Sequence, residues 1–168
     1  KRTFGKKWAW CVLLLDLSTA AIVTAVFACL FGLYFDSYQF GAAYTGFFAL
    51  LGHAYPVWYK FKGGKGFLVY MSVIWFIDWR AGLVALGIML VLLAITRYMS
   101  LSTVTAMLSC PITLAVRNAP ASVILLCTVS VLYIAFRHKE NFKRLIKGAE
   151  SKFSMTTSKS ADSREQAV

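Results

Sequence analysis

Residues 52–66 read GHAYPVWYKFKGGKG, a stretch that opens in an apolar run and ends in a cluster of glycine and lysine. Apolar segments flank the cluster on both sides, at 41–59 and 67–77. The whole chain is 59% hydrophobic, and its mean hydropathy is +0.65. A soluble domain of 168 residues does not bury that much apolar surface, so we expect the chain to fold in a lipid bilayer.

Six apolar runs follow one another, at 8–34, 41–59, 67–77, 81–96, 101–116 and 119–136. A spanning helix needs about 20 residues, a length that the first, second, fourth and sixth runs meet or approach. The fifth run carries several Ser and Thr residues and Pro111, so we expect it to pack inside the bundle. The third is short enough for a re-entrant segment. The predicted fold is an all-α, polytopic membrane helix bundle with about six transmembrane helices.

The net charge of +11 comes from basic residues between and after the apolar runs, which favours a membrane protein over a nucleic-acid-binding one. If all six runs cross, one side of the membrane holds 16 of the 18 Lys and Arg residues, and only Arg80 and Arg117 fall on the other. Basic residues accumulate in cytoplasmic loops. The pattern therefore favours six crossings, with both termini and the 60–66 loop in the cytoplasm.

Residues 1–150 are expected to form the membrane domain, and 151–168, rich in Ser, Thr and charge, a disordered cytoplasmic tail. The first apolar run has no cleavage-like end and the chain begins without Met, so we expect no signal peptide and a natural start farther upstream. The cysteines form no CxxC pair, so we expect small buried hydrophobic residues rather than zinc ligands or disulfides. They are Cys11, Cys29, Cys110 and Cys127.

The FKGGKG segment has the features of a phosphate-binding loop. Its glycines can take positive φ and leave backbone N–H groups uncovered, and consecutive bare N–H groups form an anion-binding concavity. Phe67 then opens a helix whose N-terminus carries free donors and partial positive charge. An ordinary positive-inside loop explains the same spacing, and both interpretations remain open. A Walker P-loop is excluded, because Gly66 rather than Ser or Thr follows Lys65.

Two ionisable residues in apolar runs are further candidates. His53, three residues ahead of Pro56, can serve as a proton acceptor or phosphate donor, although a lone histidine is more often structural. Asp16 lies about two turns into the first run, where an ionisable group is costly unless it is paired or lines a polar cavity. A functional role and a structural pairing with a basic residue explain Asp16 equally well.

Four motifs together resemble the bacterial integral-membrane glycerol-3-phosphate acyltransferases that use acyl phosphate as donor. Residues 52–66 resemble the family's GHxFPVxxxFKGGKG motif, 2–7 and 13–17 resemble RTLGKK and LLLDL, 96–102 resembles TRYVSLxS, and 137–150 resembles RHRENxxRLxxGxE. The similarity runs in the family's order through nearly all of residues 2–150.

The resemblance implies an enzyme of phospholipid synthesis that transfers a fatty acyl group from acyl phosphate to the 1-hydroxyl of glycerol 3-phosphate. The products would be lysophosphatidic acid and inorganic phosphate. It also implies a multi-pass protein of the bacterial cytoplasmic (inner) membrane, with seven spans in the full family and an active site facing the cytoplasm. The implied partners are the two substrates and membrane lipid, with no nucleic acid, cofactor, metal or acyl-enzyme. The resemblance also implies that the donor's own phosphate takes the hydroxyl proton, so His53 need not be the base.

The family's motifs also imply roles for individual residues. The residues implied in catalysis are His53, Lys65 and Asn141, of which Lys65 also holds a phosphate group. Those implied in substrate and phosphate binding are Arg2, Lys62, Gly63, Gly64, Gly66, Ser100 and His138. The family's SGNxGATN-like segment and first span, which precede the position of Arg2, are absent from this sequence, and Thr19 replaces a lysine. We therefore expect a truncated form of a full-length enzyme, with an inactive fragment as the alternative.

A membrane transporter or binding protein for an organic phosphate is the alternative from another class. Basic loops, Asp16 and a Ser/Thr-rich helix fit that function too. Transporters commonly carry an internal repeat about the membrane midplane. The sequence shows no such repeat and gathers its basic groups on one face, which favours an enzyme working at the membrane surface.

Overall fold

The computed structural model describes residues 5–153, with side chains for Cys11, Val12 and Leu14 onward, and every regular element in that range is helical. The elements are α1 (Gly5–Phe35), α2 (Tyr38–Ala54), the short 3-10 turn η1 (Val57–Tyr59), α3 (Phe67–Ile77), α4 (Trp79–Thr96), α5 (Met99–Val116), α6 (Ala121–Arg137) and α7 (Lys139–Ile146). The predicted all-α fold is confirmed. Arg2 and residues 154–168 of the predicted tail lie outside the described residues.

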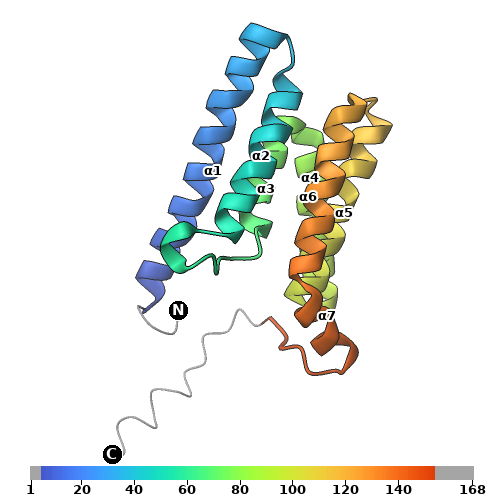
Figure 1. Ribbon diagram of the computed structural model, residues 1–168. Coiled ribbons are helices and arrows are strands. Elements are labelled where there is room, and N and C mark those ends of the chain that lie inside the picture. The colour runs from blue at the N-terminus through green and yellow to red at the C-terminus, as the bar shows by residue number, and fades with distance from the viewer. Residues whose placement is uncertain (1–4, 154–168) are drawn as a thin grey trace, which may run out of the picture.

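The helices form one bundle, in which α1, α2 and α3 stand beside α4, α5 and α6 (Figure 1). At one end, residues 60–66, which we call the glycine loop, contact α7 and the end of α6. At the same end the N–H of Phe153 donates to the carbonyl of Arg97 at 2.6 Å. At the opposite end, the side chain of Gln39 donates to the carbonyl of Ile77 at 3.1 Å. This alternation of helix ends agrees with the arrangement that the charge pattern predicts.

Three stretches within the described residues are long and apolar enough to cross a membrane, namely Leu14–Phe35, Trp79–Thr96 and Met99–Val116. α6 and α7 add a fourth only when taken together, and they are bent by 54°. α2 has 17 residues and α3 has 11. The six-crossing arrangement therefore stays a prediction.

The second apolar run extends to Tyr59, but its helix, α2, already ends at Ala54. A helix over the whole run, as its composition suggested, is therefore wrong. Pro56 is the physical reason, because a proline ring disfavours helical backbone in the residue before it. Tyr55 accordingly has φ −129° and ψ 58°. The chain then makes η1 and returns along the end of α2.

α3 is about 16 Å long at 1.5 Å per residue, roughly half the hydrocarbon thickness of a bilayer. It runs antiparallel to α2, since Gly46 meets Val73 and Gly66 meets Leu50. Its Tyr70 is fully buried. Because α3 begins at the glycine loop, the loop lies recessed from the ends of α1 and α4 (Figure 1). A short third helix thus places the site below the rim of the bundle.

The structure confirms that α5 packs inside the bundle. In its spanning window 44% of the residues are buried, against 17% for the windows of α1 and α4. Cys110 on α5 and Cys127 on α6 are buried as predicted. Cys11 and Cys29 are exposed, so the prediction of burial is wrong for them. Both lie on α1, where an apolar thiol can face lipid instead of protein.

Candidate active site

The glycine loop folds back tightly against the last turn of α2. The N–H of Gly63 donates to the carbonyl of Ala54 at 3.1 Å. A Cβ atom at Gly63 would collide with the backbone of His53, and one at Gly64 would collide with the His53 Nε2 atom. Of the three glycines only Gly66 has a positive φ, of 81°. The expectation of positive φ is therefore wrong for Gly63 and Gly64, where the close approach of His53 requires glycine instead.

Arg137, the last residue of α6, holds the other side of the loop. Its Nη2 donates to the carbonyl oxygens of Gly63, at 3.0 Å, and Gly64, at 2.8 Å. Its guanidinium also lies over the ring of Tyr55, 5.5 Å from the centroid. A planar guanidinium suits such a bridging position, because its donors point in fixed directions. Arg137 therefore turns the loop carbonyls toward α6.

The backbone N–H groups after Gly63 face no acceptor in the described part of the chain. Those of Gly64, Lys65 and Gly66 make no backbone hydrogen bond, and the loop passes directly into α3. The first N–H groups of a helix have no partner within it. The donors from Gly64 to Val69 therefore form a continuous run at a helix N-terminus, which is a favourable place for an anion.

A network of polar side chains connects the loop to α5, α7 and the segment after α7. Lys65 donates a short hydrogen bond through Nζ to the Asn141 Oδ1 atom. Asn141 in turn donates to Glu150 at 2.9 Å. Ser100 and Arg144 also donate to Glu150, each at 3.1 Å. Glu150 is therefore a common acceptor that holds α5 and α7 against the loop.

The charges in this network influence one another. Partial desolvation lowers the pKa of Lys65, an effect that the nearby Glu150 charge opposes. The hydrogen bond from Asn141 is the largest cause that lowers the pKa of Glu150, and bonds from Arg144 and Ser100 add to it. At neutral pH Glu150 is therefore a carboxylate whose oxygens are already occupied by donors.

A cavity of about 320 Å³ lies beside this network. Lys65, Gly66, Ser100, His138 and Asn141 all line it. His138 is buried, and its Nδ1 lies 2.8 Å from the carbonyl oxygen of Ile134. Since a carbonyl only accepts, Nδ1 carries a proton, and the neutral ring keeps its lone pair on Nε2. Residues from the loop, α5, α6 and α7 thus converge on one polar cavity.

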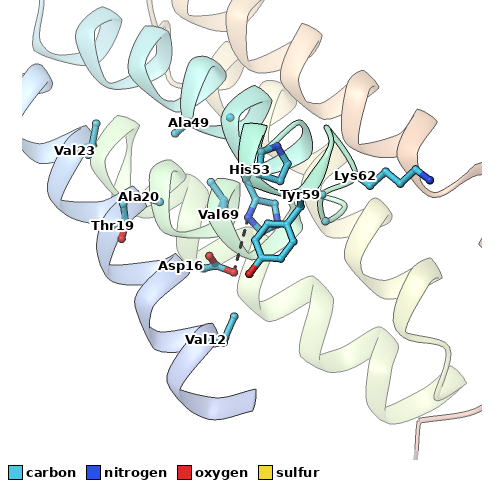
Figure 2. A pocket seen from close by; sticks show the side chains of 14 residues that line it. Val12, Asp16, Thr19, Ala20, Val23, Ala49, His53, Tyr59, Lys62 and Val69 are labelled. Carbon is cyan, nitrogen blue, oxygen red and sulfur yellow. Dashed lines mark ion pairs between the residues drawn. The ribbon is translucent and has the colours of Figure 1, made fainter. Parts of the chain in front are cut away.

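A larger cavity, of about 590 Å³, lies between α1 and α2 (Figure 2). Its wall is apolar along the helices, at Val12, Ala20, Val23 and Ala49, and polar where it meets the loop. Val23 and Ala49 also line a neighbouring groove of about 420 Å³. Aromatic side chains surround that groove at Phe27, Phe31, Tyr44 and Phe48. The two hollows adjoin at Val23 and Ala49, and we call them together the α1–α2 groove.

Asp16 and His53 separate the two cavities, because both residues line each of them. The Asp16 Oδ2 atom lies 3.8 Å from the His53 Nδ1 atom (Figure 2). The side chains are 42% and 25% exposed, respectively. The residue that faces the Asp16 carboxylate is thus a histidine rather than the lysine or arginine that the sequence suggested.

The comparison with known proteins identifies the chain's relatives. Residues 1–148 match the glycerol-3-phosphate acyltransferase family. The chain belongs to this family. The glycerol-3-phosphate acyltransferase of Brucella anthropi is 38% identical over 153 residues, covering 90% of this chain and 71% of the relative. That of Agrobacterium fabrum is 40% identical over 154 residues, covering 90% and 70%.

Solved structures of the glycerol-3-phosphate acyltransferase family share the fold. Crystal structures of PlsY (YgiH), an integral membrane glycerol 3-phosphate acyltransferase, superpose on the chain in two forms, both at 33% identity. The glycerol 3-phosphate form gives a TM-score of 0.81 and covers 91% of this chain and 74% of PlsY. The lysophosphatidic acid form gives 0.80 and covers 91% and 76%. The predicted family and membrane fold are thus confirmed.

The predicted site residues of this family member fall into two groups. Lys65, Gly66, Ser100, His138 and Asn141 line the small cavity, and His53 borders both cavities. Lys62, Gly63 and Gly64 line the larger one, and the Lys62 side chain points away from Asp16 and His53 (Figure 2). Arg2 lies outside the described residues.

Arg137 and Glu150 hold the site together, although neither was among the site residues predicted from the sequence. They stand at the first and last positions of the RHKENFKRLIKGAE stretch, and that placement was the available signal. Within the described residues, no group of three or more His, Cys, Asp and Glu side chains is placed to hold a metal ion.

Proposed function

We propose that the protein transfers a fatty acyl group from acyl phosphate to the 1-hydroxyl of glycerol 3-phosphate, giving lysophosphatidic acid and inorganic phosphate. One observation carries the proposal: a polar cavity with free donors shares the wall formed by Asp16 and His53 with an apolar groove. Such a pair of cavities suits one soluble anionic substrate and one substrate with a lipid tail. The similar PlsY structures in glycerol 3-phosphate and lysophosphatidic acid forms support the same substrate and product.

The phosphate of glycerol 3-phosphate binds in the small cavity. The N–H run from Gly64 to Val69 and the ammonium group of Lys65 supply donors and positive charge. The Ser100 hydroxyl and the His138 imidazole border the same space. Arg2 remains a predicted phosphate contact.

The acyl chain of the donor lies in the α1–α2 groove. Counted from Asp16, which lies beside His53, the lining of α1 to Phe31 extends over about 22 Å at 1.5 Å per residue. An extended chain advances about 1.2 Å per bond, so a sixteen-carbon chain of about 18 Å fits within this length. The groove begins beside His53, which places the reactive end of the chain next to the phosphate cavity.

The reaction needs positioning and charge stabilisation rather than an acyl-enzyme. The 1-hydroxyl oxygen attacks the carbonyl carbon of acyl phosphate, and the bond from that carbon to the phosphate oxygen breaks. The leaving phosphate takes the hydroxyl proton, so atoms and charges balance without a protein base. Lys65 and the N–H run neutralise the phosphate charges, and Asn141 fixes Lys65 through its hydrogen bond.

The site faces the cytoplasm in the bacterial inner membrane. The glycine loop, Arg97 and the basic α7 gather at one end of the bundle, as expected for the cytoplasmic side. Cysteine labelling in intact cells tests this, with Asp36→Cys and Lys147→Cys each introduced into a cysteine-free variant. A membrane-impermeant maleimide should label position 36 and leave position 147 unlabelled until the cells are opened; the reverse result contradicts the orientation.

An acyl-transfer assay tests the reaction itself. Membranes containing the protein, expressed from its full reading frame, are given palmitoyl phosphate and labelled glycerol 3-phosphate. We expect labelled lysophosphatidic acid and an equal amount of released phosphate, above membranes that lack the protein. Uptake of unchanged glycerol 3-phosphate into sealed vesicles, with no acyl transfer, would instead support the transporter alternative.

A further inference from the structure

Asp16 has no role in the proposed reaction, yet it stands in an unusual place. It lies between Leu15 and Leu17 on α1, within the long apolar helix that is a candidate span. An ionisable side chain inside a membrane helix is costly and marks a functional site when its partner lines a cavity. The partner here is His53, and the pair forms the wall between both cavities.

The two ring nitrogens of His53 face different parts of the molecule. Nδ1 faces the Asp16 carboxylate at 3.8 Å, which is an electrostatic contact rather than a hydrogen bond. Nε2 faces Gly64 so closely that a Cβ atom there would collide with it first. The carboxylate thus lies on the Nδ1 side of the ring, and the loop packs against the Nε2 side. The ring therefore links α1 to the glycine loop with its Nδ1 edge held by Asp16.

The loop is consequently held from two sides. Arg137 binds the carbonyl oxygens of Gly63 and Gly64 from α6, and His53 packs against Gly64 from α2. Any rotation of the His53 ring would change the room available to Gly64, where the run of free N–H groups begins. A change at Asp16 can therefore reach the anion-binding donors without Asp16 touching the substrate.

We propose that Asp16 is a positioning residue: it orients the His53 imidazole, which keeps the glycine loop in the shape that receives the phosphate of glycerol 3-phosphate. The inference rests on the proposed acyl transfer. Its consequence is specific, because a misplaced loop weakens binding of glycerol 3-phosphate while the α1–α2 groove still accepts the acyl donor. Tyr59, Thr19 and Lys62 border the same cavity, but within the described residues the ion-pair partner of the Asp16 carboxylate is His53.

The test is the kinetics of Asp16→Asn in membranes, with both substrates varied. We expect the KM for glycerol 3-phosphate to rise about ten-fold, with a smaller change in kcat and in the KM for palmitoyl phosphate. Asp16→Glu keeps the charge and should recover part of the loss. Asp36→Asn is the matched control, because Asp36 is exposed in the α1–α2 turn with a φ of 50°, which asparagine also adopts.

A double-mutant cycle separates positioning from a general structural role. If Asp16 acts through His53, then Asp16→Asn should add little to the loss already caused by His53→Gln. Fully additive losses overturn the proposal, as does a lower protein level in the membrane with an unchanged KM. An inactive wild-type protein would instead contradict the proposed function, so the two failures are distinguishable.

Discussion

The two ends of the helix bundle treat their polar groups in opposite ways. At the end away from the glycine loop, Asp78 accepts the N–H of Arg80 at 2.8 Å and the Nε of Arg117 at 3.3 Å. The Asp78 side chain is only 7% exposed. The Arg80 guanidinium lies over the ring of Trp79, 4.6 Å from the centroid. Both basic residues that the charge pattern assigns to this end are thus already engaged with protein groups.

At the loop end, a run of backbone N–H groups has no acceptor among the described residues. Glu150 is shared by three side chains, while the N–H groups from Gly64 to Val69 make no protein hydrogen bond. Unsatisfied donors are costly where water is excluded, so an open run of them favours a bound anion. The comparison teaches that one end is built for stability and the other for binding, and substitutions should separate the two.

The largest effect is expected for Lys65→Ala. The substitution removes the ammonium group that borders the phosphate cavity and leaves Asn141 without its donor. We expect kcat/KM for acyl transfer to fall about a hundred-fold or more, as when one key donor to a developing charge is lost. Lys139→Ala is the control, since Lys139 is an exposed lysine at the same end. Equal losses in both variants would reduce the role of Lys65 to bulk charge.

The second-largest effect is expected for Arg137→Lys, which keeps the positive charge but removes the planar guanidinium group. A lysine cannot reproduce the two directed bonds to Gly63 and Gly64, so the loop should loosen. We expect kcat/KM to fall about thirty-fold, equivalent to about 2 kcal/mol. Steady-state kinetics measure this loss. The control is Lys143→Arg, a charge-preserving change at an exposed position on α7. Wild-type kinetics for Arg137→Lys would show that the loop keeps its shape without the bridge.

Gly64→Ala tests the close approach directly. The added Cβ would meet the His53 Nε2 atom, so either the ring or the loop must move. We expect about a ten-fold loss of kcat/KM, carried mainly by the KM for glycerol 3-phosphate. Gly87→Ala makes the same chemical change on α4, where a Cβ atom meets nothing within 4 Å. The pair of variants isolates the steric effect from the general effect of losing a glycine.

The sequence was sufficient to predict most of the fold and the membership of the small cavity. Apolar runs and their lengths predicted the helices, and Pro56 explains the one large error, at the end of α2. Lys65, Ser100, His138 and Asn141 were identified through motifs and do converge. A sequence motif identifies polar side chains, and the polar side chains of these motifs line the cavity.

Interactions with backbone atoms far away in the chain could not be predicted in the same way. Arg137 binds carbonyl oxygens 74 and 73 residues earlier, and a carbonyl has no signature in the sequence. The reason for glycine at Gly63 and Gly64 was likewise missed, because it depends on where the His53 ring lies in space. The pairing of Asp16 required the relative rotation of α1 and α2, which hydropathy does not determine.

A smaller effect is expected between the two ends, in the α1–α2 groove. Ala49 lines both hollows, so Ala49→Trp should obstruct the passage between them. We expect the KM for palmitoyl phosphate to rise about five-fold, which corresponds to losing the burial of one or two methylene groups. The KM for glycerol 3-phosphate should stay unchanged. If only the KM for glycerol 3-phosphate rose, the acyl chain would have to bind outside this groove.

The smallest effect on activity is expected at the closed end, from Asp78→Ala. The substitution removes the cap of α4 and the partner of Arg117, so the free energy of unfolding should fall by about 1 kcal/mol. Thermal unfolding of the purified protein in detergent measures this, beside Glu140→Ala, which breaks an exposed pair on α7 and should leave Tm unchanged. The KM values should match the wild type in both variants. If Asp78→Ala changed the KM for glycerol 3-phosphate as strongly as Gly64→Ala does, the two ends would be coupled through α3, and the division between a stabilising end and a binding end would not hold.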